Sequence, residues 1–216
     1  MPRAATQYLP DPTDGLLARV VGSWSREKHH VLGQYLGIFA QAMRTKWSRR
    51  AYVDLFAGPG VCVDSDAHSF FDGSPLLALA QPFTDHVYVD LDATATDALA
   101  KRVAARGRDR KVTIITGDCN VVIDQVIEAL PTRDCLAFAF IDPSNWEISF
   151  ETIRRLAEGR KIDLLVTFHA QNMKRASTVA EQPRLDAFYL RVRTARCSCA
   201  RSGAPLPGQY HSIRTC

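Results

Sequence analysis

Residues 51–60 read AYVDLFAGPG, a short apolar run that ends in an acidic residue and two closely spaced glycines. A continuous apolar run of this length is typical of a strand that is buried on both faces of a parallel sheet. The glycines, with a proline between them, favour a tight turn. The segment therefore predicts a buried strand over residues 51–56 that leads into a glycine turn.

Four further apolar runs follow this strand, and amphipathic segments separate them. We predict helices between the strands, and a longer helix over residues 24–47, because apolar residues recur there at spacings of three and four. This alternation predicts an α/β fold, a doubly wound and mostly parallel sheet of the Rossmann-like type with right-handed crossovers. The predicted strands cover residues 51–56, 86–90, 111–115, 136–141 and 162–168, and the helices that follow them cover 74–80, 94–106, 121–130 and 150–158.

The composition is that of an ordinary globular chain. Its 216 residues are 46% apolar and 23% charged, which excludes a disordered or collagen-like protein and makes one domain the default. No apolar run approaches the roughly 20 residues of a membrane-spanning helix. Six cysteines are too few for a disulfide scaffold. With no secretory signal visible at the N-terminus, we expect a cytoplasmic protein.

Charge is unevenly distributed along the chain. Residues 171–216 hold eight Lys and Arg against two Asp and Glu, while the rest of the chain is slightly acidic. A basic segment of this kind either binds phosphate backbones or is a solvated tail. We therefore expect a lead-in over residues 1–22, an α/β domain over 23–172 and a basic tail over 173–216.

Acidic residues follow four of the five predicted strands: Asp54, Asp90, Asp118 and Asp142. Ligands of doubly wound sheets bind outside the carboxyl ends of the strands, so these residues are expected to line one site. Asp90 suits the two hydroxyls of a ribose, and Asp118 suits the amino group of an adenine. The alternative for each acid is to cap the helix that follows it.

The glycine turn indicates which adenosine ligand is expected. Gly58 and Gly60 allow the backbone to approach a ligand closely. The third glycine of the dinucleotide motif is missing, and the chain has no phosphate-binding loop of the Gly-x-x-x-x-Gly-Lys type. Asp54 disfavours a pyrophosphate and suits a sulfonium or an amino group. These features favour S-adenosylmethionine over NAD or ATP and argue against a nucleotide-dependent oxidoreductase.

In these motifs the chain resembles class I S-adenosylmethionine-dependent methyltransferases. Residues 54–60 look like the first motif of that class, and residues 87–92, 117–120 and 140–143 match its second, third and fourth motifs in order and spacing. The resemblance implies that Asp54 orients the methionine end of the cofactor. The cofactor site that it implies consists of Asp54, Phe56, Gly58, Gly60, Asp90, Asp118 and Cys119, with no metal ion.

A narrower resemblance is to the three-Cys-motif partner protein (TcmP) family. It rests on residues 24–35 with Lys28, on the glycine motif, on residues 73–76 (GSPL) and on residues 142–146 (DPSNW). The resemblance implies a partner protein that bears a three-cysteine motif, and it names no substrate. The helix that carries Lys28 is expected either to fold over the cofactor site as a lid or to begin with a solvated first turn.

The fourth motif bears on the reaction. Adenine-N6 methyltransferases have Asp or Asn, two prolines and an aromatic residue here, which hold and stack an extruded base. This chain keeps Asp142 and Pro143, has Ser144 in place of the second proline, and carries its aromatic residue, Trp146, one position later. We expect Asp142, Pro143 and Trp146 to act on an amino group of nucleic acid; the alternative for Trp146 is to pack under the edge of the sheet.

Two further expectations concern the whole chain. A catalytically inactive cofactor-binding or interaction module of the same fold is the alternative to an enzyme. The resemblance ends near residue 172, and class I methyltransferases have seven strands where we predict five, with residues 188–192 as a candidate sixth. We therefore expect a sheet that is incomplete at its C-terminal side, from a truncated or out-of-frame sequence.

Overall fold

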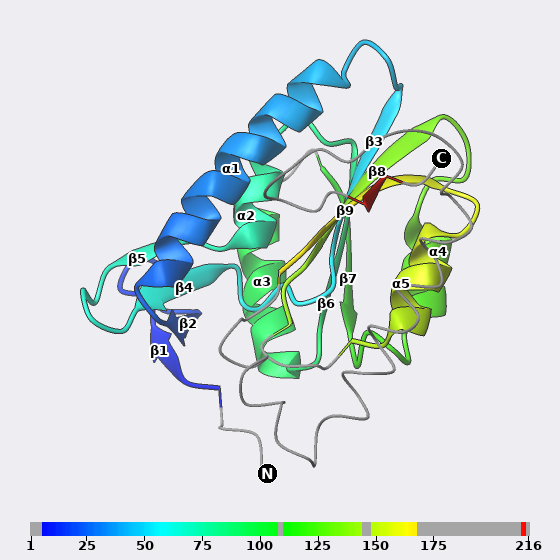
Figure 1. Cartoon of the computed structure of the whole chain (residues 1–216). Coiled ribbons are helices and arrows are strands. Elements are labelled where there is room, and N and C mark those ends of the chain that lie inside the picture. Colours follow the sequence, from blue (N-terminus) through cyan, green and yellow to red (C-terminus); the bar gives the residue numbers. More distant parts are fainter. Residues whose placement is uncertain (1–5, 108–109, 144–147, 168–212, 215–216) are drawn as a thin grey trace, which may run out of the picture.

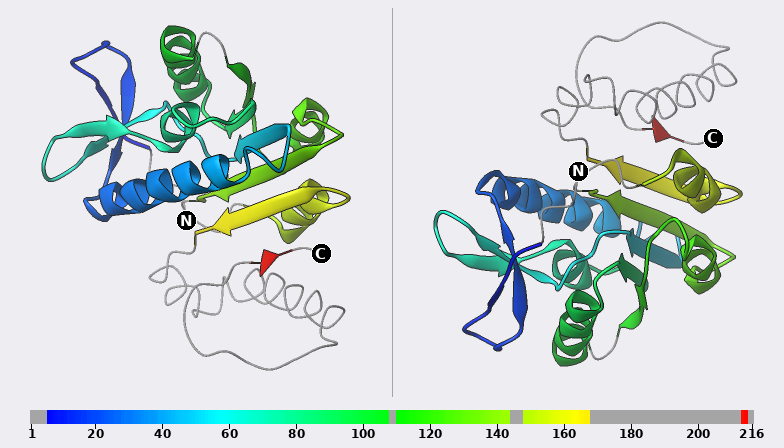
Figure 2. Two further views of the ribbon diagram at one scale, coloured as in Figure 1. Left: turned by 90° about the horizontal axis from the view of Figure 1, so that it is seen from above. Right: turned by 90° about the horizontal axis from the view of Figure 1, so that it is seen from below.

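The computed structural model describes residues 6–107, 110–143, 148–167 and 213–214 (Figure 1). In this part of the chain a six-stranded sheet forms the centre, and a four-stranded sheet lies beside it. Helices cover both faces of the larger sheet, as the two views along its edges show (Figure 2). The predicted doubly wound, mostly parallel α/β architecture is confirmed.

The larger sheet has the strand order β10-β9-β8-β3-β6-β7. Its first five strands in the chain run parallel, and the two-residue β10 pairs antiparallel with β9. The next strands in the chain, β6 and β7, lie on one side of β3, and the later strands β8 and β9 lie on its other side. The switch point of the sheet, where the direction of strand addition reverses, is therefore between β3 and β8. The bounds are β3 (Arg49–Asp54), β6 (Asp85–Asp90), β7 (Lys111–Thr116), β8 (Cys135–Ile141), β9 (Lys161–Val166) and β10 (Ile213–Arg214).

Two apolar layers hold the helices to this sheet. On one face, α1 (Trp24–Ala42), α2 (Ser74–Leu79) and α3 (Ala93–Arg106) pack on aromatic side chains of the strands, among them Tyr52 and Phe138. On the other face, α4 (Ile123–Ala129) and α5 (Phe150–Ala157) pack on small and branched side chains. Because each strand alternates between the layers, both faces are apolar, which explains the continuous apolar runs in the sequence.

The predicted elements of this domain are present with shifted ends. The first strand begins and ends two residues earlier than expected, and α1 ends at Ala42, where the prediction ran to residue 47. The candidate strand over residues 188–192 and the expected truncation lie outside the described residues. The expected lead-in, in contrast, contains two strands, β1 (Tyr8–Pro10) and β2 (Leu17–Val21).

The smaller sheet has the order β1-β2-β4-β5. β4 (Val61–Asp64) directly follows the glycine turn and pairs parallel with β2, and it forms an antiparallel hairpin with β5 (Phe70–Asp72). The segment over residues 61–72, directly after the glycines, is therefore mostly strand. This sheet extends the glycine turn into a rigid element beside the carboxyl ends of β3 and β6.

A buried arginine joins the smaller sheet to the larger one. Arg102 of α3 is 2% exposed and forms ion pairs with Asp11 at 3.5 Å and Asp14 at 2.8 Å, both in or next to the β1–β2 connection. Its guanidinium also donates to the carbonyl oxygens of Leu17 and Pro59, each at 2.7 Å. Since Pro59 belongs to the glycine turn, one side chain fixes that turn and β2 to α3.

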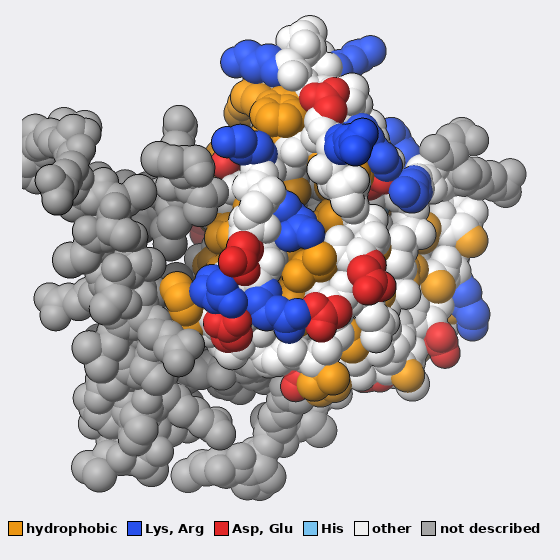
Figure 3. Space-filling view, turned by 90° about the vertical axis from the view of Figure 1, so that its right-hand side faces the viewer, with side chains coloured by type: hydrophobic (Ala, Val, Ile, Leu, Met, Phe, Trp, Pro, Cys, Tyr) orange, Lys and Arg blue, Asp and Glu red, His pale blue; other side chains and the backbone are white. Residues whose placement is uncertain are grey.

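The outer face of α4 and α5 carries basic and acidic side chains in alternation (Figure 3). Arg154 pairs with Glu151 and Glu158 along α5, and Arg155 pairs with Asp124 of α4. Basic and acidic side chains of α4 and α5 therefore pair with one another on this face. Among the described residues, no helix has the length and apolarity needed to cross a membrane.

Replacement of Arg102 by Leu is expected to destabilise the fold by about 3–5 kcal/mol, because it removes the ion-pair partner of the buried Asp11 carboxylate and the donor to the Pro59 carbonyl oxygen. Urea unfolding measures this loss. Arg106→Leu, one helical turn further along α3, is the matched control. Its ion pair with Asp72 is exposed on both sides, so the loss is expected to stay below about 1 kcal/mol. Equal losses in the two variants would contradict the role given to Arg102.

Candidate functional site

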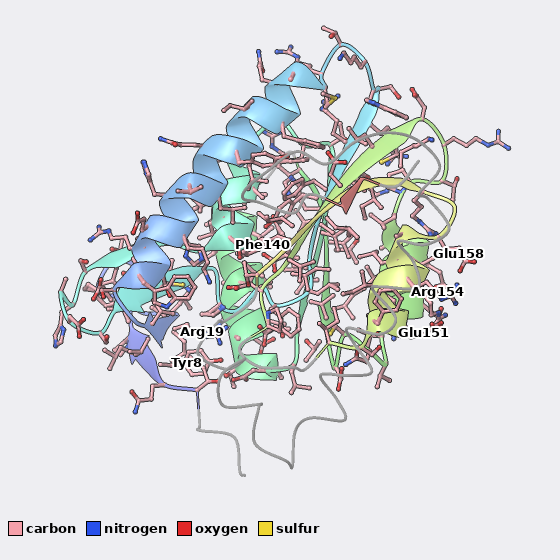
Figure 4. All side chains as sticks on the ribbon, viewed as in Figure 1. Tyr8, Arg19, Phe140, Glu151, Arg154 and Glu158 are labelled. Carbon is pink, nitrogen blue, oxygen red and sulfur yellow. The ribbon has the colours of Figure 1, made fainter. Side chains whose placement is uncertain are left out.

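The carboxyl ends of the parallel strands meet at one edge of the larger sheet. Backbone hydrogen bonds continue beyond the strands: Ala57 N–H donates to Val89 O at 2.9 Å, and Gly117 N–H donates to Asp90 O at 2.9 Å. Figure 4 shows the same region, with Tyr8 and Arg19 of the smaller sheet below α1 and Phe140 on β8. The strand-end residues that the sequence singled out are thus brought to one edge.

Asp90 holds the glycine turn in place. Its Oδ2 accepts from the N–H of Gly58 at 2.7 Å, and its Oδ1 accepts from the N–H of Asp92 at 2.9 Å. Gly58 has a φ of +62°, a conformation that favours glycine. Asp90 therefore does not cap a helix; Asp92 does, since its carboxylate accepts from the N–H of Thr94 at the start of α3.

The smaller sheet reaches this acid through a tyrosine. The Tyr8 hydroxyl donates to Asp92 Oδ2 at 2.8 Å. Burial and this hydrogen bond raise the pKa of Tyr8 well above its ordinary value, so it stays a neutral donor. A hollow of about 340 Å³ has Tyr8, Val20, Asp64 and His68 among its lining residues. This hollow lies on the smaller sheet. Tyr8, in its wall, binds Asp92, and the Asp92 N–H binds Asp90, the residue that holds Gly58.

Gly60 has a packing role that the sequence did not indicate. Its φ is +91°, and a Cβ added there would lie 3.0 Å from Leu99 Cδ1 and 3.2 Å from Leu76 Cγ. These side chains belong to α3 and α2. In this structure the missing side chain of Gly60 therefore lets two helices pack closely on the turn, and its expected contact with a cofactor stays a prediction.

Asp54 is fully buried at the end of β3. Its carboxyl group accepts from the Tyr52 hydroxyl at 3.2 Å, from the Phe56 N–H at 3.1 Å and from the Ser74 hydroxyl. Burial raises the pKa of Asp54 to about 7; the hydrogen bonds oppose this rise, and the charge of Asp142 adds to it. The expected contact of Asp54 with the methionine end of a cofactor stays a prediction. In this structure Asp54 joins β3 to α2 through its hydrogen bond with Ser74.

Asp142 lies beyond the end of β8, directly at the switch point. The ammonium of Lys28 forms an ion pair with its Oδ2, and the Thr167 hydroxyl donates to its Oδ1. The side chains of Lys28 and Asp142 are only 15% and 18% exposed. A solvated first turn of α1 is therefore the wrong picture for Lys28. The sequence motifs single out this lysine, but nothing in the sequence pairs it with Asp142.

The other two residues of the fourth motif have different outcomes. Pro143 is buried beside Asp142. Trp146 lies outside the described residues, so its expected role stays a prediction.

The loop after β7 is organised by its own side chains. Asp118 is exposed, and its Oδ1 accepts from the backbone N–H and the side-chain amide of Asn120 at 2.8 and 2.9 Å. The Asn120 carbonyl oxygen in turn accepts from Ser149 N–H and the Thr152 hydroxyl at the start of α5. Asn120 therefore joins the two loops, a role that the sequence did not suggest. Cys119 is 4% exposed and packs in the apolar layer under α4 and α5.

No protein-family model matches this chain, and no curated protein sequence matches it. Among solved structures it is similar to protein LPL1258 from Legionella pneumophila, of the family DUF519, with a TM-score of 0.53 and 13% identity over 74% of this chain and 73% of that one. A weaker likeness is to the "Putative methyltransferase yhhF" of Escherichia coli, with a TM-score of 0.47 and 16% identity over 74% of this chain and 78% of that one. At these identities the likeness shows the fold alone.

Asp54→Asn is expected to become more stable relative to the unmodified chain as the pH rises from about 4 to about 7. In the folded protein the pKa of Asp54 is raised from 3.8 to about 7. Between these pH values the unfolded chain releases the Asp54 proton more readily than the folded chain does, so the unmodified protein loses folding stability as the pH rises. Above about pH 7 this loss is constant. The Asn side chain carries no such charge. Urea unfolding of both proteins at several pH values measures the difference. A difference that does not vary with pH would contradict the raised pKa.

Proposed function

We propose that this chain is an S-adenosylmethionine-dependent methyltransferase that acts on an amino group of nucleic acid. The observation that carries the proposal is the arrangement around β3. Asp90, at the end of β6, is hydrogen-bonded to the glycine turn on one side, and Asp142, at the end of β8, lies on the other side. A cofactor whose ribose binds Asp90 would extend across the end of β3 toward Asp142.

Asp90 has the capacity to bind a ribose in addition to its internal partners. Each of its two oxygens accepts one backbone N–H, and each carboxylate oxygen can accept a second hydrogen bond. Asp118 is exposed and can accept from the adenine amino group. When bound, S-adenosylmethionine supplies an electrophilic methyl group, so the residues of this chain need chiefly to align the acceptor.

Asp142 is the residue that would receive the acceptor. A carboxylate takes N–H donors, and here it stands at the switch point, where ligands of this fold bind. Nucleic acid is favoured as the acceptor because residues 171–216 carry the excess of basic side chains described above, which suits a phosphate backbone. Trp146, if it stacks on a base as the resemblance implies, would complete this part of the site.

The second candidate is a cofactor-binding module that is inactive alone and acts with a three-Cys-motif partner. One observation favours it: both carboxylate oxygens of Asp142 are engaged by Lys28 and Thr167 within the chain. Lys28 or Thr167 must move away before an acceptor binds Asp142, and in this candidate the binding of the partner causes that movement. The two candidates share the cofactor site and differ in turnover.

Asp90→Ala is expected to weaken the binding of S-adenosylhomocysteine by about 10- to 100-fold, since the ribose loses hydrogen bonds to a charged acceptor. Isothermal titration calorimetry with the purified chain measures this. Asp97→Ala, at an exposed position of α3, is the matched control and should bind as the unmodified chain does. Absence of binding to the unmodified chain, at millimolar ligand, would overturn the proposed cofactor.

Methyl transfer from labelled S-adenosylmethionine to RNA or DNA is expected to be abolished by Asp142→Ala and kept by Asp124→Ala. Asp124 is also an ion-paired aspartate, but it lies on the outer face with Arg155. The assay is run with the chain alone and with a three-Cys-motif protein added. Activity in the first case supports the enzyme, whereas activity only in the second supports the partner-dependent module. Transfer that survives Asp142→Ala would contradict the role of Asp142 in both.

A further inference from the structure

Asp142, the carboxylate proposed to bind the acceptor, already has two partners within the chain. Lys28 of α1 reaches across the end of the sheet and places its ammonium on Asp142 Oδ2, while the Thr167 hydroxyl takes Oδ1. The two side chains of the ion pair are mostly shielded from solvent, at 15% and 18% exposure. Shielding makes such a pair stronger than one on the open surface. A ligand that needs Asp142 must therefore compete with this pair.

The competing group has the same chemistry as the proposed acceptor. An ammonium offers N–H donors to a carboxylate oxygen, as does an amino group. A carbon acceptor offers no such donor and gains nothing from Asp142. We propose that Lys28 occupies the place of the acceptor's amino group on Asp142, and that an acceptor binds by displacing the lysine ammonium. This inference rests on the proposed function and restricts its acceptors to nitrogen that bears hydrogen.

The surroundings of Lys28 allow its side chain to leave while α1 stays in place. The backbone around it is anchored: Arg26 donates to the Ser69 hydroxyl at 2.8 Å, and the His29 ring packs edge-on against Phe71 at 5.6 Å. The ammonium, in contrast, ends a flexible four-carbon stem. It already lies 4.8 Å from the centre of the Trp24 ring, whose face can hold a cation. Displacement is thus a side-chain movement from Asp142 toward Trp24.

Two cofactor analogues test this without a known acceptor. S-adenosylhomocysteine lacks the methyl group, and sinefungin has a carbon that bears an amino group in place of the methylated sulfur. The amino group of sinefungin is directed to where the methyl group is transferred, so it competes with Lys28 for Asp142. The homocysteine analogue does not. A variant that changes the rest of the cofactor site alters both affinities equally. The ratio of the affinity for sinefungin to that for S-adenosylhomocysteine therefore measures only the competition between the sinefungin amino group and Lys28.

Lys28→Met keeps the length of the side chain and removes the ammonium. It is expected to raise the affinity for sinefungin relative to S-adenosylhomocysteine by about tenfold, which corresponds to the loss of a competitor worth about 1.4 kcal/mol. Lys28→Arg keeps a cation and should leave the ratio near that of the unmodified chain. Lys46→Met, beyond the far end of α1, is the matched control. Thermal unfolding identifies variants that fail to fold, and Lys28→Gln then replaces Lys28→Met.

Each outcome decides between distinct readings. A raised ratio in Lys28→Met, absent from the double variant Lys28→Met/Asp142→Asn, supports the displacement. Binding of both analogues with an unchanged ratio overturns the displacement and leaves the proposed cofactor intact. Weaker binding of both analogues in Lys28→Met assigns the lysine to cofactor binding and also overturns it. If the unmodified chain binds neither analogue, the proposed function fails, and this inference fails with it.

Discussion

The carboxylates at the ends of the parallel strands impose the constraint on which the rest of this structure depends. A parallel sheet brings the ends of β3, β6 and β8 to one edge, and in this chain each ends in or next to an aspartate. Charges of one sign gathered in this way must be compensated. Asp54 is buried with three donors and a raised pKa, Asp90 takes two backbone N–H groups, and Asp142 takes an ammonium and a hydroxyl. The positions of α1, α2 and the glycine turn follow from these partners.

The glycine turn is consequently held from several directions. Asp90 binds it from β6, Arg102 binds the carbonyl oxygen of Pro59 from α3, and the side chains of Leu76 and Leu99 fill the space beside Gly60. The smaller sheet adds a covalent extension through β4. A turn fixed in this way is preorganised, so a ligand that approaches its backbone loses little free energy to the ordering of the loop.

Most of the larger sheet and the line of acids at its edge could be predicted from the sequence, because continuous apolar runs and strand-end residues are local signals. The smaller sheet could not, since β1 and β5 are three residues long and show no alternation. The ion pair between Lys28 and Asp142 joins residues 114 positions apart, which no spacing reveals. For Gly60 the residue type was noticed, but its reason lay in the packing of Leu76 and Leu99, which only the three-dimensional arrangement shows.

The position of β3 at the centre of the sheet has a consequence for how the chain is made. Ala51 pairs with Asp85 on one side and with Ala137 on the other, so one edge of the central strand has no partner until the chain has been synthesised past β8. Pairings between distant segments form slowly, and an unpaired apolar strand invites association with other chains. During translation, β3 with β6 and β7 would form a half-sheet whose open edge is the switch point itself. Closure of that edge by β8 brings Asp142 to Lys28, and β9, which follows β8 in the chain, then brings Thr167 to the same carboxylate.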